Sequence, residues 1–207
     1  TILDFGPVQI ALARHFGFCF GVENAIERAY KALDENPGKR IYLISHMIHN
    51  QAVNQDLEEN GFRFIQDTEG NQLIDWNEVR KDDVVLIPAF GTTLAVESIL
   101  KEKGIDADTY NTTCPFVEKV WNRSKKLSET QYSILIHGKP SHEETRATFS
   151  HAAENGPALV LKDMKEAQLL GKLILENAPA SEFETHFGDR VSEGFNFNSI
   201  INLKNYL

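Results

Sequence analysis

Two cysteines occupy the same kind of local setting in this sequence. Cys19 lies between Gly17 and Gly21 in HFGFCFGVENAI, where a segment with helical spacing begins. Cys114 follows the extended run DTYNTT and precedes Pro115, and proline is favoured at the first position of a helix. A helix N-terminus stabilises a thiolate, which is the form of cysteine that ligates metals. The alternative is that both are buried, inert cysteines, which is the commoner fate of this residue type.

Two histidines lie at comparable turns. His49 belongs to SHMIHN and His142 belongs to HGKPSHEET, and each stretch follows an apolar run and leads into a helix-like one. Protonated histidines donate hydrogen bonds to phosphate oxygens, so the pair predicts an anion site. The alternative is that each histidine is structural or merely exposed. We expect His15, His151 and His186 to be ordinary residues.

Two acids, Glu143 and Glu144, follow His142 at the head of an expected helix. Acids in a first helical turn complement the helix dipole, which is the simpler interpretation. The functional interpretation is that one of them donates protons beside a phosphate-binding histidine, with its pKa raised by burial or by a nearby anion. In PAFGTT, we expect Thr92 and Thr93 to cap the next helix rather than to bind an anion.

Short apolar runs alternate with amphipathic stretches and must position these side chains. We expect strands at 41–45, 83–91, 132–138 and 158–161, and helices at 22–33, 51–60, 94–103, 115–127 and 163–176. Unbroken apolar runs are typical of parallel strands covered on both faces, and their alternation with helices predicts an α/β fold. Residues that follow parallel strands meet at one edge of the sheet, where ligands bind. We expect both cysteines and both histidines at such an edge.

Composition limits the class of protein. The 207 residues are 42% hydrophobic and 25% charged, with a net charge of −9, which argues against general binding to nucleic acid or to an anionic membrane. No apolar run approaches the roughly 20 residues of a membrane-spanning helix. Two cysteines favour a reducing compartment over a disulfide framework. A domain boundary is expected near 112–115, which gives units at 1–113, with Cys19, and 114–207, with Cys114 and the HEET motif.

Five ordered blocks of this sequence resemble a known family. GFCFGVENAI, HMIHNQAVNQDLEENG, PAFGT, TTCPFVEKVW and HGKPSHEETRAT are similar to the corresponding blocks of the 4-hydroxy-3-methylbut-2-enyl diphosphate reductase, or LytB, family. The order and spacing of these blocks match from about residue 13 to residue 149. The segments PAFG and HGKPSHEET are most similar to those of the plant and cyanobacterial branch.

This resemblance implies repeated small parallel-sheet α/β units, three in the family and two here, in a trefoil-like arrangement around a 4Fe-4S cluster. Cys19 and Cys114 match two of three cluster ligands. His49 and His142 match histidines that hold the diphosphate. Glu144 matches the acid that supplies protons, with Glu143 as the second choice. The implied reaction is the reductive dehydroxylation that gives isopentenyl and dimethylallyl diphosphate, with ferredoxin or flavodoxin as the electron donor.

Two features depart from the family pattern. Phe90 stands where many members carry a substrate-binding histidine, as in the PAFG branch. The chain ends before the family's third cysteine, so we expect a fragment of the enzyme, with the third unit missing and the third cysteine encoded beyond Leu207. The implied compartment is the cytoplasm of a bacterium or, after removal of a transit peptide, the plastid stroma.

Two further hypotheses compete with the reductase. The first is a non-catalytic descendant of the family that binds a diphosphate or a partner through the same loops. The second is a tetrahedral zinc site formed by Cys19, Cys114, His49 and His142, although the sequence holds no C-x-x-C pair. A basic stretch is a candidate docking surface for an acidic electron donor, although a solvated helix face is the simpler interpretation; it contains Lys119, Arg123, Lys125 and Lys126.

Overall fold

The computed structural model describes residues 1–14, 16–130, 132–176, 180–192 and 195. The expectation for His15 therefore lies outside the described residues. The strands are β1 (Ile2–Asp4), β2 (Gln9–Ala11), β3 (Ile41–Leu43), β4 (Phe62–Phe64), β5 (Val84–Leu86), β6 (Ile134–His137) and β7 (Ala158–Leu161). The helices are α1 (Phe20–Glu35), α2 (Gln51–Glu59), η1 (Trp76–Glu78), α3 (Leu94–Glu102), α4 (Pro115–Ser128), α5 (Glu143–Asn155), α6 (Met164–Leu175), α7 (Ala180–Phe187) and η2 (Gly188–Arg190).

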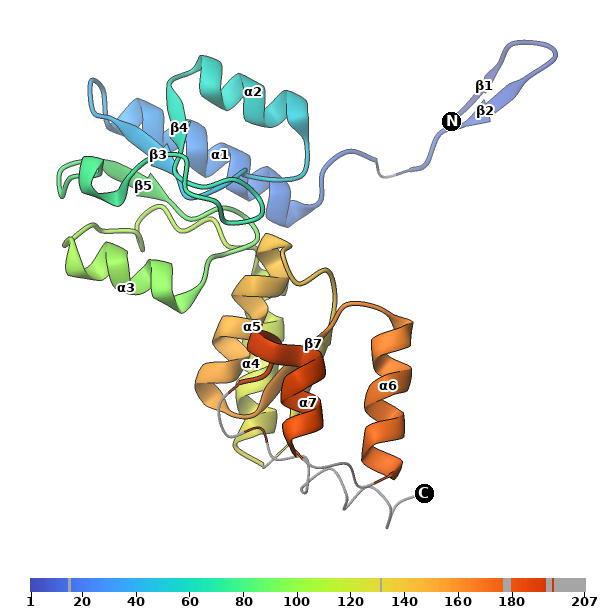
Figure 1. Ribbon diagram of the computed structural model, residues 1–207. Helices are drawn as coiled ribbons and strands as arrows, with labels where there is room; N and C mark the ends of the chain where they lie inside the picture. Colours follow the sequence, from blue (N-terminus) through green and yellow to red (C-terminus); the bar gives the residue numbers. More distant parts are fainter. Residues whose placement is uncertain (15, 131, 177–179, 193–194, 196–207) are drawn as a thin grey trace.

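The first sheet is a parallel sheet of three strands in the order β4-β3-β5. Because side chains alternate along a strand, Ile41 and Leu43 pack against α1 and α2, whereas Tyr42 and Ile44 pack on the other face with Val96 of α3. Helices therefore cover both faces of this sheet (Figure 1). Helices α2 and α3 end just before Gly61 and Gly104, as the sequence predicts.

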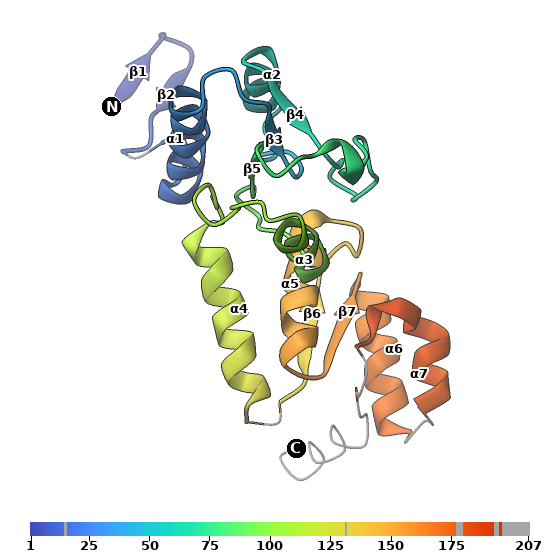
Figure 2. The same ribbon diagram turned by 90° about the vertical axis from the view of Figure 1, so that its left-hand side faces the viewer.

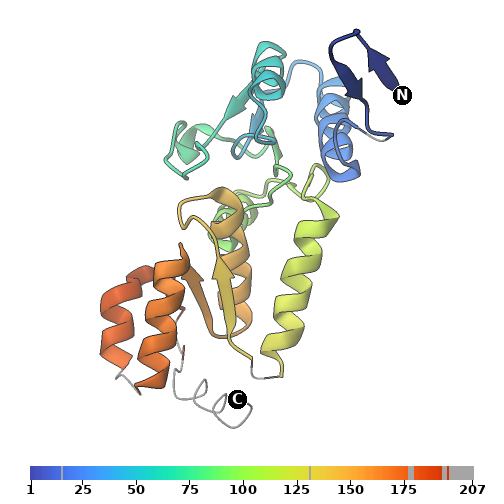
Figure 3. The same cartoon turned by 90° about the vertical axis from the view of Figure 1, so that its right-hand side faces the viewer.

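The second sheet pairs β6 with β7 in parallel. Strand β7 is buried along its whole length, and its Leu159 and Leu161 form a core with α6 and α7. Helices α4 and α5 lie on one side of the two strands, with α6 and α7 on the other (Figures 2 and 3). Strand β6 is only partly covered, and Leu135 is 49% exposed. The expectation that every strand is covered on both faces was wrong for β6.

An antiparallel hairpin of β1 and β2 precedes α1 and projects away from the two sheets (Figure 1). The sequence analysis assigned no structure to this segment. All residues of both strands are exposed, among them Ile2, Leu3 and Ile10. An isolated two-stranded hairpin is marginally stable by itself, so the described fold leaves this apolar segment without the cover that strands normally require.

The predicted α/β class with small parallel sheets is confirmed. The strands are shorter than predicted, since β5 spans Val84–Leu86 rather than 83–91, and β4 was missed because three residues are too few to show a period. The division at residue 113 into units stays a prediction, and part of 114–207 lies outside the described residues. No helix among the described residues has the length and apolar character to cross a bilayer.

Candidate functional site

Each cysteine is the residue immediately before a helix. Cys19 is the N-cap of α1, and Cys114 is the N-cap of α4, which begins at Pro115. Neither thiol makes a capping hydrogen bond, so the sulfur atoms are not used to stabilise the helices. Both cysteines are free; Cys19 is exposed and Cys114 is partly exposed. The two thiols therefore have the helix-terminal setting that the sequence predicts.

The start of α4 lies against the start of α1. A Cβ atom built on Gly21 would lie 2.4 Å from the Sγ of Cys114, which only glycine permits. Gly21 is two residues from Cys19, so Cys114 is held close to the segment that carries the other thiol. The backbone of Cys114 is fixed by its N–H, which donates to the carbonyl of Ala89 at 2.9 Å.

The turn that carries Phe90 depends on a second glycine. Gly91 has a φ of +73°, and a Cβ atom there would lie 2.2 Å from the Trp121 ring of α4. Thr93 caps α3 by accepting a hydrogen bond from the N–H of Val96, so its expected capping role is confirmed. This packing joins the loop after β5 to the helix that Cys114 begins.

The loop that carries His49 is fixed by a residue that the sequence analysis missed. Buried Asn54 accepts a hydrogen bond from the N–H of Met47 at 2.9 Å and donates to the carbonyl oxygens of Ile48 and Asn50. Asn50 in turn caps α2. The available signal was a second asparagine four residues after Asn50, on an otherwise apolar helix face that includes Val53 and Leu57.

His142 has a structural task of its own. Its Nδ1 accepts a hydrogen bond from the backbone N–H of Glu144 at 3.2 Å and so caps α5. A nitrogen that accepts carries no hydrogen, so the neutral ring holds its proton on Nε2. The Nε2–H group is therefore the donor that His142 offers.

The two predicted histidines meet at Phe90. The ring centroids of His49 and His142 are 4.7 Å apart, and those of His49 and Phe90 are 4.5 Å apart. Burial lowers the pKa of His49, and the neighbouring His142 and His46 lower it further, whereas Glu144 acts in the opposite direction. An anion between the rings would reverse this balance by favouring the protonated form.

The two adjacent acids have opposite environments. Glu144 is exposed, whereas Glu143 is buried and accepts a hydrogen bond from the hydroxyl of Ser45 through Oε2. Burial raises the pKa of Glu143 to about 7, against the lowering effects of the Ser45 hydrogen bond and the charge of Arg146. Oε1 of Glu143 lies 3.6 Å from Nε2 of His49. The catalytic assignment of Glu144 stays a prediction, since no observation here tests it.

A cavity of about 590 Å³ opens beside this cluster at the N-terminus of α2. Its lining includes His46 and His49 together with the polar residues Asn50, Gln51, Asn54, Gln55 and Glu58. The backbone N–H groups at a helix start suit an anion, and the histidines supply donors. The volume and polarity fit a small charged ligand.

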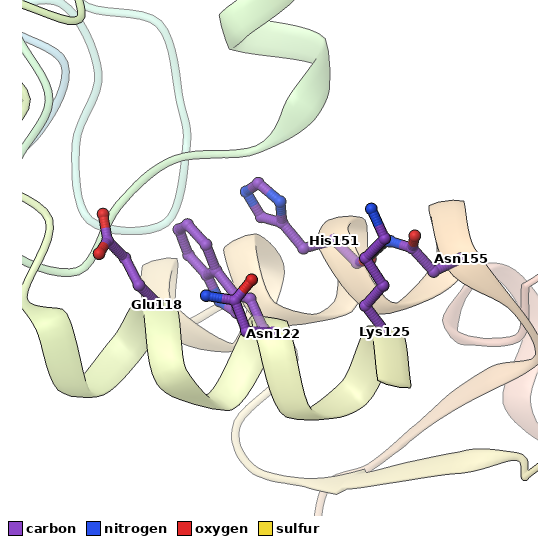
Figure 4. A pocket seen from close by; sticks show the side chains of 6 residues that line it. Glu118, Asn122, Lys125, His151 and Asn155 are labelled. Carbon is purple, nitrogen blue, oxygen red and sulfur yellow. Dashed lines mark hydrogen bonds between the residues drawn. The ribbon is translucent and has the colours of Figure 1, made fainter. Parts of the chain in front are cut away.

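A second cavity, of about 430 Å³, follows the seam between α4 and α5 (Figure 4). Its floor is the Trp121 ring stacked on the His151 ring, with centroids 3.8 Å apart. His151 also contacts the carbonyl of Thr92 at 3.2 Å. The cavity contains none of the predicted cysteine, histidine and glutamate site residues, although Lys125 of the candidate docking surface lines it. The ordinary role expected for His151 stays a prediction.

Among the described residues, no group of three or more His, Cys, Asp and Glu side chains could hold a metal ion. The zinc hypothesis for Cys19, Cys114, His49 and His142 was therefore wrong, because the fold does not bring these four residues into one coordination sphere. The two thiols fit a different role as part of a larger ligand set, since both are free and Gly21 leaves room for the Cys114 sulfur.

Comparison with known proteins identifies close relatives. A family model described as "LytB protein" matches residues 10–184. A 4-hydroxy-3-methylbut-2-enyl diphosphate reductase of Synechococcus sp. (strain WH7803) is 40% identical over 93% of this chain and 47% of its own length. The reductase of Synechocystis sp. (strain ATCC 27184 / PCC 6803 / Kazusa) is also 40% identical, over 93% of this chain and 49% of its own length. The chain thus spans about half the length of these curated relatives.

Solved structures with the same fold carry related titles. "Structure of (E)-4-Hydroxy-3-methyl-but-2-enyl Diphosphate Reductase, the Terminal Enzyme of the Non-Mevalonate Pathway" aligns with a TM-score of 0.62 and 26% identity, and covers 80% of this chain and 54% of that chain. A diphosphate reductase from Plasmodium falciparum aligns with a TM-score of 0.62 and 26% identity, over 73% of this chain and 44% of that chain.

Proposed function

The chain belongs to the LytB protein family, and from that premise we propose that it forms part of a 4-hydroxy-3-methylbut-2-enyl diphosphate reductase of isoprenoid biosynthesis. The single observation that carries the proposal is the contact between the Cys114 sulfur and Gly21. It brings a thiol from the start of α4 to the start of α1, where Cys19 supplies the other. Two free thiols at converging helix N-termini are suited to share one metal centre.

In this proposal Cys19 and Cys114 hold a 4Fe-4S cluster together with a third cysteine from outside these 207 residues. When bound, the cluster supplies electrons and a Lewis-acidic iron for the departing hydroxyl group. The two α/β units at 1–113 and 114–207 would then be two of the three that surround the cluster.

The remaining chemistry belongs to the chain's own side chains. His49 and His142 bind the diphosphate as hydrogen-bond donors, and Phe90 forms an apolar wall beside His49. Removal of the hydroxyl as water breaks a C–O bond, forms a C–H bond and consumes two electrons and two protons. Glu144, exposed at the start of α5, is the proton donor, with Glu143 as the second choice. The products are isopentenyl and dimethylallyl diphosphate.

The electrons come from a carrier protein such as ferredoxin or flavodoxin. An acidic carrier needs a positive surface on a chain whose net charge is −9. The exposed cations of α4 supply one; they are Lys119, Arg123, Lys125 and Lys126. The setting proposed is a reducing one, the bacterial cytoplasm or the plastid stroma.

The test is reconstitution of the complete protein, as its gene encodes it, with iron and sulfide under strict exclusion of air. We expect acid-labile sulfide and iron in the protein, and loss of both in Cys19→Ser and Cys114→Ser. Glu118→Gln, an exposed change in the first turn of α4, is the matched control and should retain the cluster.

Three results separate the possibilities. A cluster that depends on both cysteines, together with turnover of the allylic diphosphate, supports the reductase. Binding of the diphosphate without a cluster would leave the non-catalytic descendant. A complete protein that binds neither iron nor diphosphate would overturn the proposal.

A further inference from the structure

The proposed reaction gives no task to the most deeply buried acid of the site. The Glu143 side chain is 4% exposed, although it stands in the first turn of a helix where acids normally face water. Its Oε2 accepts a hydrogen bond from Ser45, in the loop after β3. Its Oε1 is buried and has no hydrogen-bond partner within the described part of the chain. Such an unsatisfied oxygen is costly, which calls for an explanation.

Helix capping does not supply that explanation. The first turn of α5 is capped by the Nδ1 of His142, which takes the N–H of Glu144. The carboxyl of Glu143 instead reaches across to the first sheet, where Ser45 holds it. Nε2 of His49 lies 3.6 Å from the free Oε1. This separation is slightly longer than a hydrogen bond, so a small rotation of the ring would bring Nε2 within hydrogen-bond distance of Oε1.

We propose that Glu143 is a positioning residue that fixes the protonation pattern of His49, so that the ring nitrogen remote from Glu143, Nδ1, carries a hydrogen for a phosphate oxygen as long as the pair holds its shared proton. The inference rests on the proposed function, in which His49 binds the diphosphate. A neutral carboxyl group donates its O–H to Nε2, which places the ring hydrogen on Nδ1. An ionised carboxylate accepts Nε2–H from the imidazolium ring, in which Nδ1 is also protonated. Both states therefore leave Nδ1 as a donor.

The surrounding charges decide where the shared proton lies. His49 is faced by Glu143, His142, His46 and Glu144. Glu143 is itself faced by three further groups, which are Arg146, Glu144 and Asp67. With the pKa of Glu143 raised to about 7 and that of His49 lowered, the shared proton of the empty site lies on Glu143 rather than on His49. A bound anion draws this proton to the ring, so no proton needs to come from water.

The decisive measurement is the ¹⁵N spectrum of His49 in the complete protein labelled at histidine, with the signal assigned from His49→Gln. We expect the Nδ1–H tautomer in the wild type. Glu143→Gln should keep it, because its amide donates to Nε2 as the neutral acid does. Glu143→Leu, which has no donor, should shift the ring toward Nε2–H. Glu154→Leu, an exposed change on the same helix, is the matched control.

A second readout follows the affinity for inorganic pyrophosphate against pH by calorimetry. Glu143→Leu should bind about tenfold more weakly below pH 7. The affinity of the wild type should fall above pH 7, where the pair loses its shared proton, whereas Glu143→Gln, which keeps Nδ1–H, should show no such fall. If Glu143→Leu does not fold, the titration of His49 in Glu143→Gln decides, because it should lose the inflection that Glu143 causes.

Wild-type and variant proteins with the same tautomer and the same titration curve would overturn the inference. The tautomer is read without any ligand, so this result is distinct from failure of the proposed function, which would appear as absence of pyrophosphate binding in the wild type.

Discussion

The loops that follow β3 and β6 each place a histidine at the same site, but they hold it in opposite ways. In the loop after β3, the backbone is fixed by Asn54, and the His49 ring makes no contribution to that support. In the loop after β6, the His142 ring is itself the support, because its Nδ1 caps α5. His49 is therefore carried by a loop backbone that other residues fix, whereas His142 itself stabilises the start of the helix that follows its loop.

This difference teaches that similar sequence contexts do not give equivalent site residues. Replacing His49 should affect binding alone, whereas replacing His142 should affect binding and stability together. Glu143, the first residue of α5, accepts a hydrogen bond from Ser45 in the loop after β3 and so connects the two loops. Variants that remove one of the two supports, or separate it from ligand binding, test this contrast.

The largest expected effect comes from Asn54→Ala. The change removes three hydrogen bonds and leaves the N–H of Met47 unpaired in a buried loop. At roughly 1–1.5 kcal/mol for each bond, the free energy of unfolding should fall by about 4 kcal/mol. Urea denaturation followed by circular dichroism measures this loss.

Asn60→Ala is the matched control for the Asn54 variant. Asn60 follows the same helix and donates to the carbonyl of Asp56, but its side chain is exposed. Water replaces an exposed bond, so the loss should stay within about 0.5 kcal/mol. Equal losses in the two variants would show that the buried loop does not depend on Asn54.

The next effect is a dependence of stability on pH that Glu143 causes. Its pKa is raised from 4.5 to about 7, so the folded chain keeps a proton that the unfolded chain loses between these values. Stability therefore falls as pH rises through this window, by up to about 3 kcal/mol. Glu143→Gln removes this loss. Between pH 5 and pH 8, its free energy of unfolding should therefore rise relative to that of the wild type.

The control for this comparison must account for His49. The lowered pKa of His49 acts in the opposite sense, because its contribution to stability is lost as pH falls below 6.5. Because Glu143 and His49 share a proton, the two curves are compared in the His49→Gln background, where only the titration of Glu143 separates them. A difference curve without slope between pH 4.5 and 7 would mean that Glu143 titrates as an exposed acid.

The fold class, the helix ends and the loops that carry the two histidines could be predicted from the sequence, whereas the contacts that hold those loops could not. The alternation of apolar and amphipathic runs predicted the α/β class, and local signals such as Pro115 and Gly61 predicted where helices begin and end. These features depend on neighbours in the chain. They also placed His49 and His142 on corresponding loops.

The remainder depends on contacts between distant residues. Nothing local distinguishes Glu143 from Glu144, because the burial of Glu143 arises from Ser45, 98 residues earlier in the chain. Asn54 has the appearance of an ordinary polar helix residue until the loop folds over it. The short strand β4 and the exposed β1–β2 hairpin also lacked a period long enough to be recognised.

The smallest expected effect separates the two tasks of His142. His142→Ala should lose the cap of α5, which costs about 1 kcal/mol, and also the Nε2–H donor. His142→Asn should recover the lost stability, because asparagine is among the best N-cap residues, but its amide is too short to replace the donor. In His142→Asn, thermal unfolding should therefore return to the wild-type temperature while pyrophosphate binding stays weak.

His49→Asn is the control at the other loop. It should bind pyrophosphate weakly while its stability stays within about 0.5 kcal/mol of the wild type. If His142→Ala is as stable as His142→Asn, His142 is not the cap, and the contrast between the two loops fails.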